Sequence, residues 1–171
     1  PPPAGIEDSP APTVAIAGEW DLHYPELAVN LARYDLVLTD PAGVDALTSE
    51  LVAPQYQGPL YAPDLAPAAG PETGKDIDVL FIGPLNHARH HRRARFLERL
   101  AALSNRYNVV ITWRPHDEEY GRYLRRARIV FTHSDRGELG AGVLDALASG
   151  PLCLVEEANR EASQWLADGR D

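Results

Sequence analysis

The amino-acid sequence predicts an α/β fold made of two Rossmann-like units, each with a parallel sheet. Short apolar runs alternate with segments of helical periodicity, the order of elements that produces parallel strands. A stretch rich in Pro and Gly interrupts this alternation at residues 63–76. The net charge of the two sides of this stretch also differs. Residues 1–75 hold eleven acidic residues against Arg33 and Lys75, whereas residues 76–171 hold fourteen acidic and fourteen basic residues. We therefore expect two units of different character, both incomplete, joined by a linker.

The first unit is expected to span residues 13–62. Apolar runs predict its strands, and the segments between them have helical spacing. The expected strands cover residues 14–17, 35–40 and 58–62, and the expected helices cover 27–31 and 44–51. Residues 1–12 hold five prolines and few apolar side chains, which predicts a disordered lead-in or an extended arm.

The second unit is expected to span residues 77–171 and continues the alternation. Its expected strands cover 78–82, 109–113, 129–132 and 152–155, and its expected helices cover 90–103, 118–126 and 139–148. The polar turn at residues 133–137 lies between a strand and a helix that ends at Gly150 and Pro151. Such a turn lies where the carboxyl ends of parallel strands meet a helix amino terminus, so we expect a phosphate-bearing ligand there.

Several features of the composition bear on the cellular compartment of the protein. Hydrophobic residues make up 44% of the 171 residues, which suffices for packed cores. No apolar stretch approaches the roughly 20 residues that a membrane span requires. No signal-peptide pattern is evident, and the single Cys153 cannot form an internal disulfide. We therefore expect a cytoplasmic protein without a transmembrane segment.

The charged residues do not indicate nucleic-acid binding. Only one of the 16 basic residues is a lysine, which we interpret as a genomic composition bias, and the net charge is −9. The sequence lacks Met and begins with three prolines, so we expect a piece of a longer protein.

A basic loop follows the first strand of the second unit. The segment NHARHHRRAR, residues 86–95, contains three histidines and four arginines. Arginine forks can clamp a pyrophosphate and stabilise a leaving diphosphate, so we expect phosphate contact at Arg89 or Arg92 and a solvated helix face for the others. A zinc site is the other candidate, but no Cys or acidic residue stands at ligand spacing in the segment.

Three segments carry a resemblance to a known family. DVLFIGPLNHARHHRR is a strand leading into the basic loop, YGRYLRRARIVFTHS is a helix leading to a strand and Ser, and RGELGAGVLDALASGPLCLVEE is the most specific. Through them, residues 77–165 resemble the carboxyl-terminal nucleotide-binding domain of GT-B glycosyltransferases, in particular the group 1 family and its spore-maturation-protein-like branch. GEWDLH, YDLVLTDPAGVDAL and LYAPDL resemble, less strongly, the end of the acceptor-side domain.

The resemblance implies an activity. Members of the family transfer a sugar from a nucleotide diphosphate sugar to an acceptor, and the branch implies retention of configuration. The partners would be the nucleotide sugar and an acceptor that the sequence does not identify. Apart from the donor no cofactor is expected, and no metal ion is needed, because arginines and a helix dipole can neutralise the diphosphate. A chain that spans only parts of both domains is expected to bind nucleotide weakly and to transfer no sugar alone.

The resemblance assigns roles to two acids. Family members hold a Glu before the helix and a second acid within it that grips ribose hydroxyls, and Glu138 and Asp145 occupy these places. They lie seven residues apart where many members have eight, and Asp stands where Glu is usual. Without the resemblance, Asp145 is an acid on a helix surface. Glu138 is then a first-turn acid that stabilises the helix by about 0.3–1 kcal/mol.

The remaining site residues also follow from the resemblance. We expect the diphosphate near Gly83, Arg89 and the helix start at Leu139, and the base near His116. His23 corresponds to a first-domain loop that faces the acceptor and the donor sugar, and we assign it a catalytic role with Glu138. Donor binding is assigned to Gly83, Asn86, Arg89, Arg92, His116, Ser134, Arg136, Leu139 and Asp145.

Two other functions are weighed against this one. A receiver-like phospho-switch would use Asp40 as the phosphoacceptor, but it also needs an acidic pair, for which only Glu19 and Asp21 are available, and a Lys on a later strand. The only Lys is Lys75, in the expected linker. A degenerate glycosyltransferase-like module that binds nucleotide or a protein partner without catalysis is the main alternative.

Overall fold

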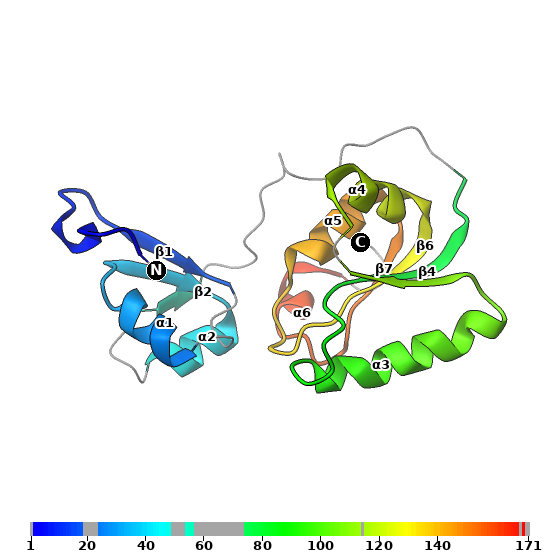
Figure 1. Cartoon of the computed structure of the whole chain (residues 1–171), viewed down its shortest axis with the longest axis horizontal. Coiled ribbons are helices and arrows are strands. Elements are labelled where there is room, and N and C mark those ends of the chain that lie inside the picture. The colour runs from blue at the N-terminus through cyan, green and yellow to red at the C-terminus, as the bar shows by residue number, and fades with distance from the viewer. Residues whose placement is uncertain are drawn as a thin grey trace. The chain divides into compact units, whose positions relative to one another are not determined.

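The computed structural model describes residues 2–18, 24–48, 54–56, 74–113, 115–167 and 169. The chain divides into two compact units, Pro1–Pro59 and Leu60–Asp171. Each unit has its own sheet, and every strand pairing in both sheets is parallel (Figure 1). The predicted α/β class with two parallel sheets is therefore confirmed.

The first unit contains a three-stranded sheet with the order β1-β2-β3. Its elements are η1 (Ile6–Asp8), β1 (Val14–Ala17), α1 (Tyr24–Leu31), β2 (Leu36–Thr39), α2 (Pro41–Leu47) and β3 (Pro54–Tyr56). Asp40 starts α2, because its side chain accepts a hydrogen bond from the amide of Gly43 at 2.8 Å and Pro41 takes the first helical position. The candidate phosphoacceptor of a receiver module is thus a helix cap.

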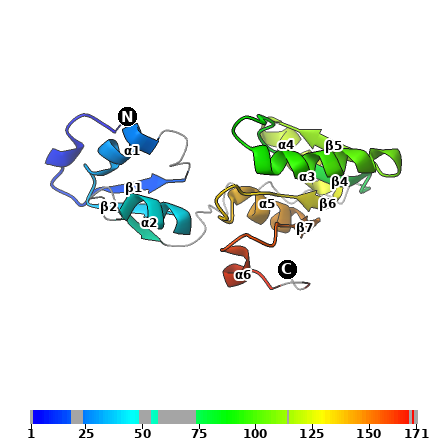
Figure 2. The same cartoon turned by 90° about the horizontal axis from the view of Figure 1, so that it is seen from below.

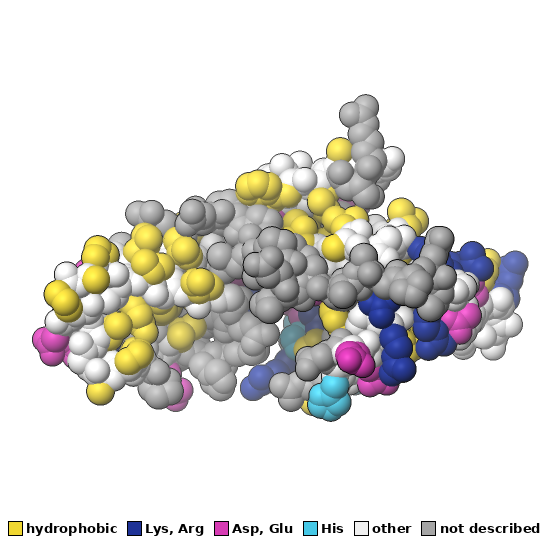
Figure 3. Space-filling model, turned by 90° about the horizontal axis from the view of Figure 1, so that it is seen from above, with side chains coloured by type: hydrophobic (Ala, Val, Ile, Leu, Met, Phe, Trp, Pro, Cys, Tyr) yellow, Lys and Arg dark blue, Asp and Glu magenta, His cyan; other side chains and the backbone are white. Residues whose placement is uncertain are grey.

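Both helices of this unit pack on one face of its sheet. Ala28 of α1 and Leu47 of α2 belong to the same buried cluster as Val37 of β2. Alternate strand residues point to the other face, where Val14 and Ile16 are exposed. Figure 3 shows apolar side chains on the surface of this unit, whereas most Lys and Arg side chains in that view belong to the second unit.

The second unit contains a four-stranded sheet with the order β5-β4-β6-β7, and α6 lies beyond β7 (Figure 2). Its elements are β4 (Ile77–Ile82), α3 (His91–Ala102), η5 (Leu103–Asn105), β5 (Val109–Thr112), α4 (Asp117–Arg126), β6 (Ala127–Phe131), α5 (Ala141–Ser149), β7 (Leu152–Leu154) and α6 (Ala162–Trp165).

Helices cover both faces of the second sheet (Figure 1). α3 packs on one face, where Leu97 shares a buried cluster with Phe81. α4 and α5 pack on the other, where Leu124 and Ala146 share a cluster with Leu80. α3 and α5 therefore lie on opposite faces, while the loops after β4 and β6 meet at the same carboxyl edge.

Several boundaries differ from those expected. α2 begins at Pro41 and not at residue 44, because Asp40 caps it. α5 begins at Ala141 and not at Leu139, because Gly140 has an extended backbone (φ −65°, ψ 155°) and forms the N-cap. The described part of residues 1–12 is not simply extended, since η1 forms a helical turn there and Glu7 pairs with Arg33.

The middle of the chain also differs from expectation. The third strand of the first sheet is β3, at residues 54–56, where Pro54 can begin an edge strand. The strand expected at 58–62 lies outside the described residues, and so does most of the expected linker at 63–76. Within the described ranges, no helix has the length and apolar character needed to cross a membrane.

Candidate functional site

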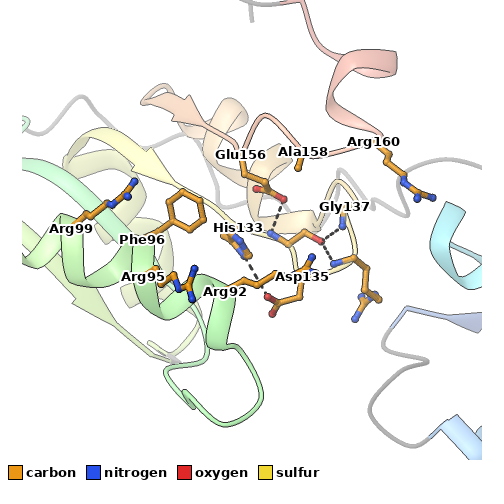
Figure 4. A pocket seen from close by; sticks show the side chains of 12 residues that line it. Arg92, Arg95, Phe96, Arg99, His133, Asp135, Gly137, Glu156, Ala158 and Arg160 are labelled. Carbon is orange, nitrogen blue, oxygen red and sulfur yellow. Dashed lines mark hydrogen bonds and ion pairs between the residues drawn. The ribbon is translucent and has the colours of Figure 1, made fainter.

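A pocket opens beside the carboxyl edge of the second sheet (Figure 4). It has a volume of about 650 Å³ and lies between α3, the turn after β6 and the segment after β7. Its lining comes from residues 92–99, 133–137 and 156–160. We call it the arginine pocket, because each of these three segments contributes at least one arginine. Its volume is in the range of small-molecule sites.

α3 supplies the strongest positive charge of the arginine pocket. Arg92, Arg95 and Arg99 follow the spacing i, i+3, i+7, so they lie along one side of the helix. All three are exposed. Among the described residues, none gives these three side chains a hydrogen bond or an ion pair. Their charge is therefore available to an anionic ligand.

The turn after β6 is organised by Ser134. Its Oγ accepts hydrogen bonds from the amides of Arg136, Gly137 and Glu138, at 3.1, 2.9 and 3.1 Å. The same hydroxyl donates to Glu138 Oε2. Arg136 Nη2 donates to Glu138 Oε1 at 2.9 Å. Both carboxylate oxygens of Glu138 are thus engaged within the turn.

The segment after β7 holds the turn from the other side. Glu156 Oε1 accepts from the Ser134 amide at 3.0 Å, and Asn159 Nδ2 donates to the Glu138 carbonyl at 2.8 Å. The buried Glu161 accepts from the Leu139 amide. These contacts explain why residues 134–139 form a fixed loop and do not extend α5.

A buried arginine joins α3 to the same turn. Arg93 is 8% exposed and donates to the carbonyls of His133 and Pro84, at 3.0 and 3.3 Å. Asp135 lies 3.7 Å from Arg93 Nη2, and one of its oxygens is 2.6 Å from His90 Nδ1. Burial lowers the pKa of the Arg93 guanidinium, while the charges of Asp135, Glu138 and Glu156 oppose this shift.

His133 forms part of the pocket wall. Its side chain is 4% exposed, and its ring lies 5.1 Å from that of Phe96. Burial lowers the pKa of His133, while Glu156 and Asp135 act in the opposite direction. His133 Nδ1 and Glu156 Oε2 are both buried without a hydrogen-bond partner among the described atoms. Unsatisfied buried polar atoms of this kind are uncommon.

Three of the predicted donor-binding residues meet at the arginine pocket: Arg92, Ser134 and Arg136. Glu138 joins them through its bonds to Ser134 and Arg136. Leu139 is buried, and its amide is bonded to Glu161.

The other predicted residues lie elsewhere. The Gly83 amide donates to the Thr112 carbonyl, and Asn86 holds its own loop by accepting from the amides of Ala88, Arg89 and His90. The Arg89 side chain is exposed and has no hydrogen bond or ion pair with the described residues. His116 is exposed at the start of α4. Asp145 accepts a hydrogen bond from the Tyr120 hydroxyl at 2.9 Å, and His23 lies outside the described residues.

The amino end of α5 offers free backbone donors. The amides of Gly140, Ala141 and Gly142 have no acceptor among the described residues, and Gly140 and Ala141 are exposed. In the described part of the chain, no group of three His, Cys, Asp or Glu side chains is arranged to hold a metal ion.

No protein-family model and no curated protein matches this chain.

Sequence reasoning did not single out several residues of the pocket. Arg95 was expected on a solvated helix face, and Arg99 was not among the expected site residues. The spacing i, i+3, i+7 of Arg92, Arg95 and Arg99 nevertheless indicates that they share one side of a helix. Glu156 follows a strand at the carboxyl edge, the position that marks a site in parallel sheets. The burial of His133 had no sequence signal, because it depends on the packing of Phe96 from a distant helix.

Proposed function

We propose that this chain carries the donor-binding part of a glycosyltransferase of the GT-B type, which moves a sugar from a nucleotide diphosphate sugar to an acceptor with retention of configuration. The observation that carries the proposal is that the exposed side chains of Arg89 and Arg92, which have no hydrogen bond or ion pair with the described residues, lie in the loop after β4 and the first turn of α3. These are at the carboxyl edge of a parallel sheet, the usual place for phosphate-bearing ligands.

The donor diphosphate would lie at this edge between two sets of donors. Arg89 reaches out from the loop after β4, and the free amides of Gly140, Ala141 and Gly142 begin α5 after β6. Because β4 and β6 are neighbours in the sheet, their loops are neighbours too. Arginine forks and a helix amino terminus together neutralise a diphosphate and stabilise it as a leaving group. Arg92 would assist from the first turn of α3.

Glu138 keeps its catalytic role in this proposal, whereas the role of His23 remains an expectation from the sequence, because His23 lies outside the described residues. Glu138 lies two residues before the α5 N-cap, beside the expected phosphates, and its bonds to Ser134 and Arg136 fix the direction of its carboxylate. Such a fixed acid can orient the hydroxyls of the transferred sugar. Asp145 would meet the ribose only if it exchanged its bond to Tyr120, and His116 would lie near the base.

Calorimetry with nucleoside diphosphates tests the donor site. Arg89→Ala should weaken binding by about 1–3 kcal/mol, because a charge-assisted hydrogen bond to phosphate is lost. Arg122→Ala, which removes an exposed arginine from α4, is the matched control and should not change affinity. Glu138→Ala should spare binding of the bare diphosphate but abolish donor turnover in the full-length enzyme. Equal losses for Arg89→Ala and Arg122→Ala would exclude this donor site.

A second candidate function is a nucleotide- or protein-binding module without catalysis. It is favoured by the engagement of both candidate acids, since Glu138 is bonded to Ser134 and Arg136, and Asp145 to Tyr120. Nucleotide binding without any donor turnover, in a protein that contains both complete domains, would favour this module over the enzyme.

A further inference from the structure

The arginine pocket holds more positive charge than a donor diphosphate at the sheet edge can use. Arg99 lies eight residues into α3 from His91, which corresponds to about 12 Å along the helix axis. The free amides of α5 belong to a helix on the opposite face of the sheet. A diphosphate bound to those amides and to Arg89 would therefore leave Arg95 and Arg99 unoccupied.

Arg95 and Arg99 also repel each other. They are four residues apart on one helix, and like charges at this spacing destabilise it. Phe96 lies beside them in the lining and contributes the apolar part of the wall (Figure 4). No acidic side chain of α3 lies on this side, because Glu98, the acid of the helix, is not part of the lining. A bound anion would relieve the repulsion.

The wall across from α3 has a different chemistry. Glu156 is held by its Oε1 to the Ser134 amide at 3.0 Å, and its Oε2 has no hydrogen-bond partner among the described atoms. His133 Nδ1, also buried, has no hydrogen-bond partner either, although it lies 3.8 Å from Asp135 Oδ1, and it belongs to the same wall. A hydroxyl group that enters beside Phe96, directly or with a bridging water, would satisfy them. The pocket therefore combines cationic forks, an apolar ring and acceptors for hydroxyl groups.

We propose that the half of the arginine pocket formed by Arg95, Phe96, Arg99 and Glu156 binds an acidic sugar. The acidic group, a phosphate or a carboxylate, contacts Arg95 and Arg99, since both anions fit the guanidinium fork. The ring lies against Phe96, and its hydroxyls face Glu156 and His133. This site for an acidic sugar does not rest on the proposed glycosyl transfer.

Calorimetry with small sugars tests the site. The probes are glucose 6-phosphate, glucuronate, neutral glucose and inorganic phosphate, each added to the chain as it stands. We expect an acidic sugar to bind at least tenfold more tightly than glucose or inorganic phosphate. Binding of glucose 6-phosphate alone identifies the acid as a phosphate, and binding of glucuronate alone identifies it as a carboxylate.

Variants assign the binding to this half of the pocket. Arg95→Ala with Arg99→Ala should weaken the acidic sugar at least tenfold, and circular dichroism should be unchanged because both side chains are exposed. Arg122→Ala should have no effect. Glu156→Gln, which keeps an oxygen for the Ser134 amide, should weaken binding of the acidic sugar relative to inorganic phosphate, because only the sugar has hydroxyl groups that donate to the carboxylate.

Three results would overturn the proposal. One is equal affinity for inorganic phosphate and the acidic sugars, which would mean that no sugar ring is recognised. Another is the absence of binding by either acidic sugar. The third is loss of nucleoside diphosphate binding in the Arg95 and Arg99 double variant, which would assign the pocket to the donor. Acidic-sugar binding without any nucleotide binding would instead refute the proposed function and leave the sugar site standing.

Discussion

Ser134 and Glu138 are joined across the turn after β6, because the Ser134 hydroxyl donates a hydrogen bond to Glu138 Oε2. The same oxygen of Ser134 accepts from the amides of residues 136, 137 and 138. One side chain therefore satisfies three backbone donors and orients the acid that we assign to catalysis. Serine favours turns through local bonds of this kind.

Ser134→Ala should destabilise the second unit by about 1–3 kcal/mol, because it removes the acceptor for three amides in a partly buried turn. Urea unfolding followed by circular dichroism measures the loss. Ser104→Ala is the matched control, since the Ser104 hydroxyl only donates to the Ala101 carbonyl at an exposed position, and its effect should stay within about 0.5 kcal/mol. If Ser134→Ala lowers the free energy of unfolding no more than Ser104→Ala does, water replaces the Ser134 hydroxyl as the acceptor for the three amides.

The fold could be predicted because it depends on local patterns. The apolar run before Gly83 and the one before His133 are recognisable as buried strands. Two helical segments and the strand β5 alternate between them, an order that produces parallel strands. Helix starts were less predictable where a cap decides them. Asp40 starts α2 three residues before the apolar spacing becomes visible, and Gly140 delays α5 by two residues.

The candidate site could be predicted only in part, because much of it consists of contacts between distant segments. Ser134 and Arg136 were expected at a phosphate turn, and they do lie at a pocket. The sequence did not predict the hydrogen bond from the Leu139 amide to Glu161, since the two residues are 22 positions apart. The same holds for Tyr120, which bonds Asp145 from a different helix. Pairings of this kind depend on how the helices pack, which periodicity does not specify.

Gly137→Ala should destabilise the second unit by about 1–3 kcal/mol. Gly137 has a φ of +80°, which costs an alanine about 1–2 kcal/mol, and an added Cβ would lie 3.3 Å from the Ala158 carbonyl oxygen and from the Arg160 amide. Both neighbours are backbone atoms, and the Arg160 amide donates to the Gly137 carbonyl at 2.9 Å. These backbone atoms cannot move far enough to make room for the added methyl group.

Gly140→Ala provides the control for this prediction. Gly140 has a φ of −65°, and an added Cβ meets nothing within 4 Å. The substitution should change the stability by less than about 1 kcal/mol, because the gain through the unfolded state is opposed by the lower preference of Ala for an N-cap. Thermal unfolding of both variants gives the comparison. If Gly137→Ala and Gly140→Ala have similar melting temperatures, the left-handed backbone of Gly137 does not require a glycine.

His133 should make the stability of the second unit depend on pH. Burial lowers the pKa of His133 in the folded protein, so the unfolded chain binds the proton more readily. The stability gained by keeping the imidazole neutral is fully present above the unfolded pKa of about 6.5 and is lost as the pH falls below it. Urea unfolding between pH 7.5 and pH 5 should therefore show decreasing stability, and His133→Asn should show a shallower decrease.

The charges that face His133 are Glu156, Asp135 and Arg93, and His90 also contacts Asp135, so the difference between wild type and variant isolates the contribution of His133. NMR titration of the His133 ring provides the independent measurement. A midpoint above 6.5, or an unchanged slope in the variant, would mean that the carboxylates of Glu156 and Asp135 outweigh the desolvation of the ring.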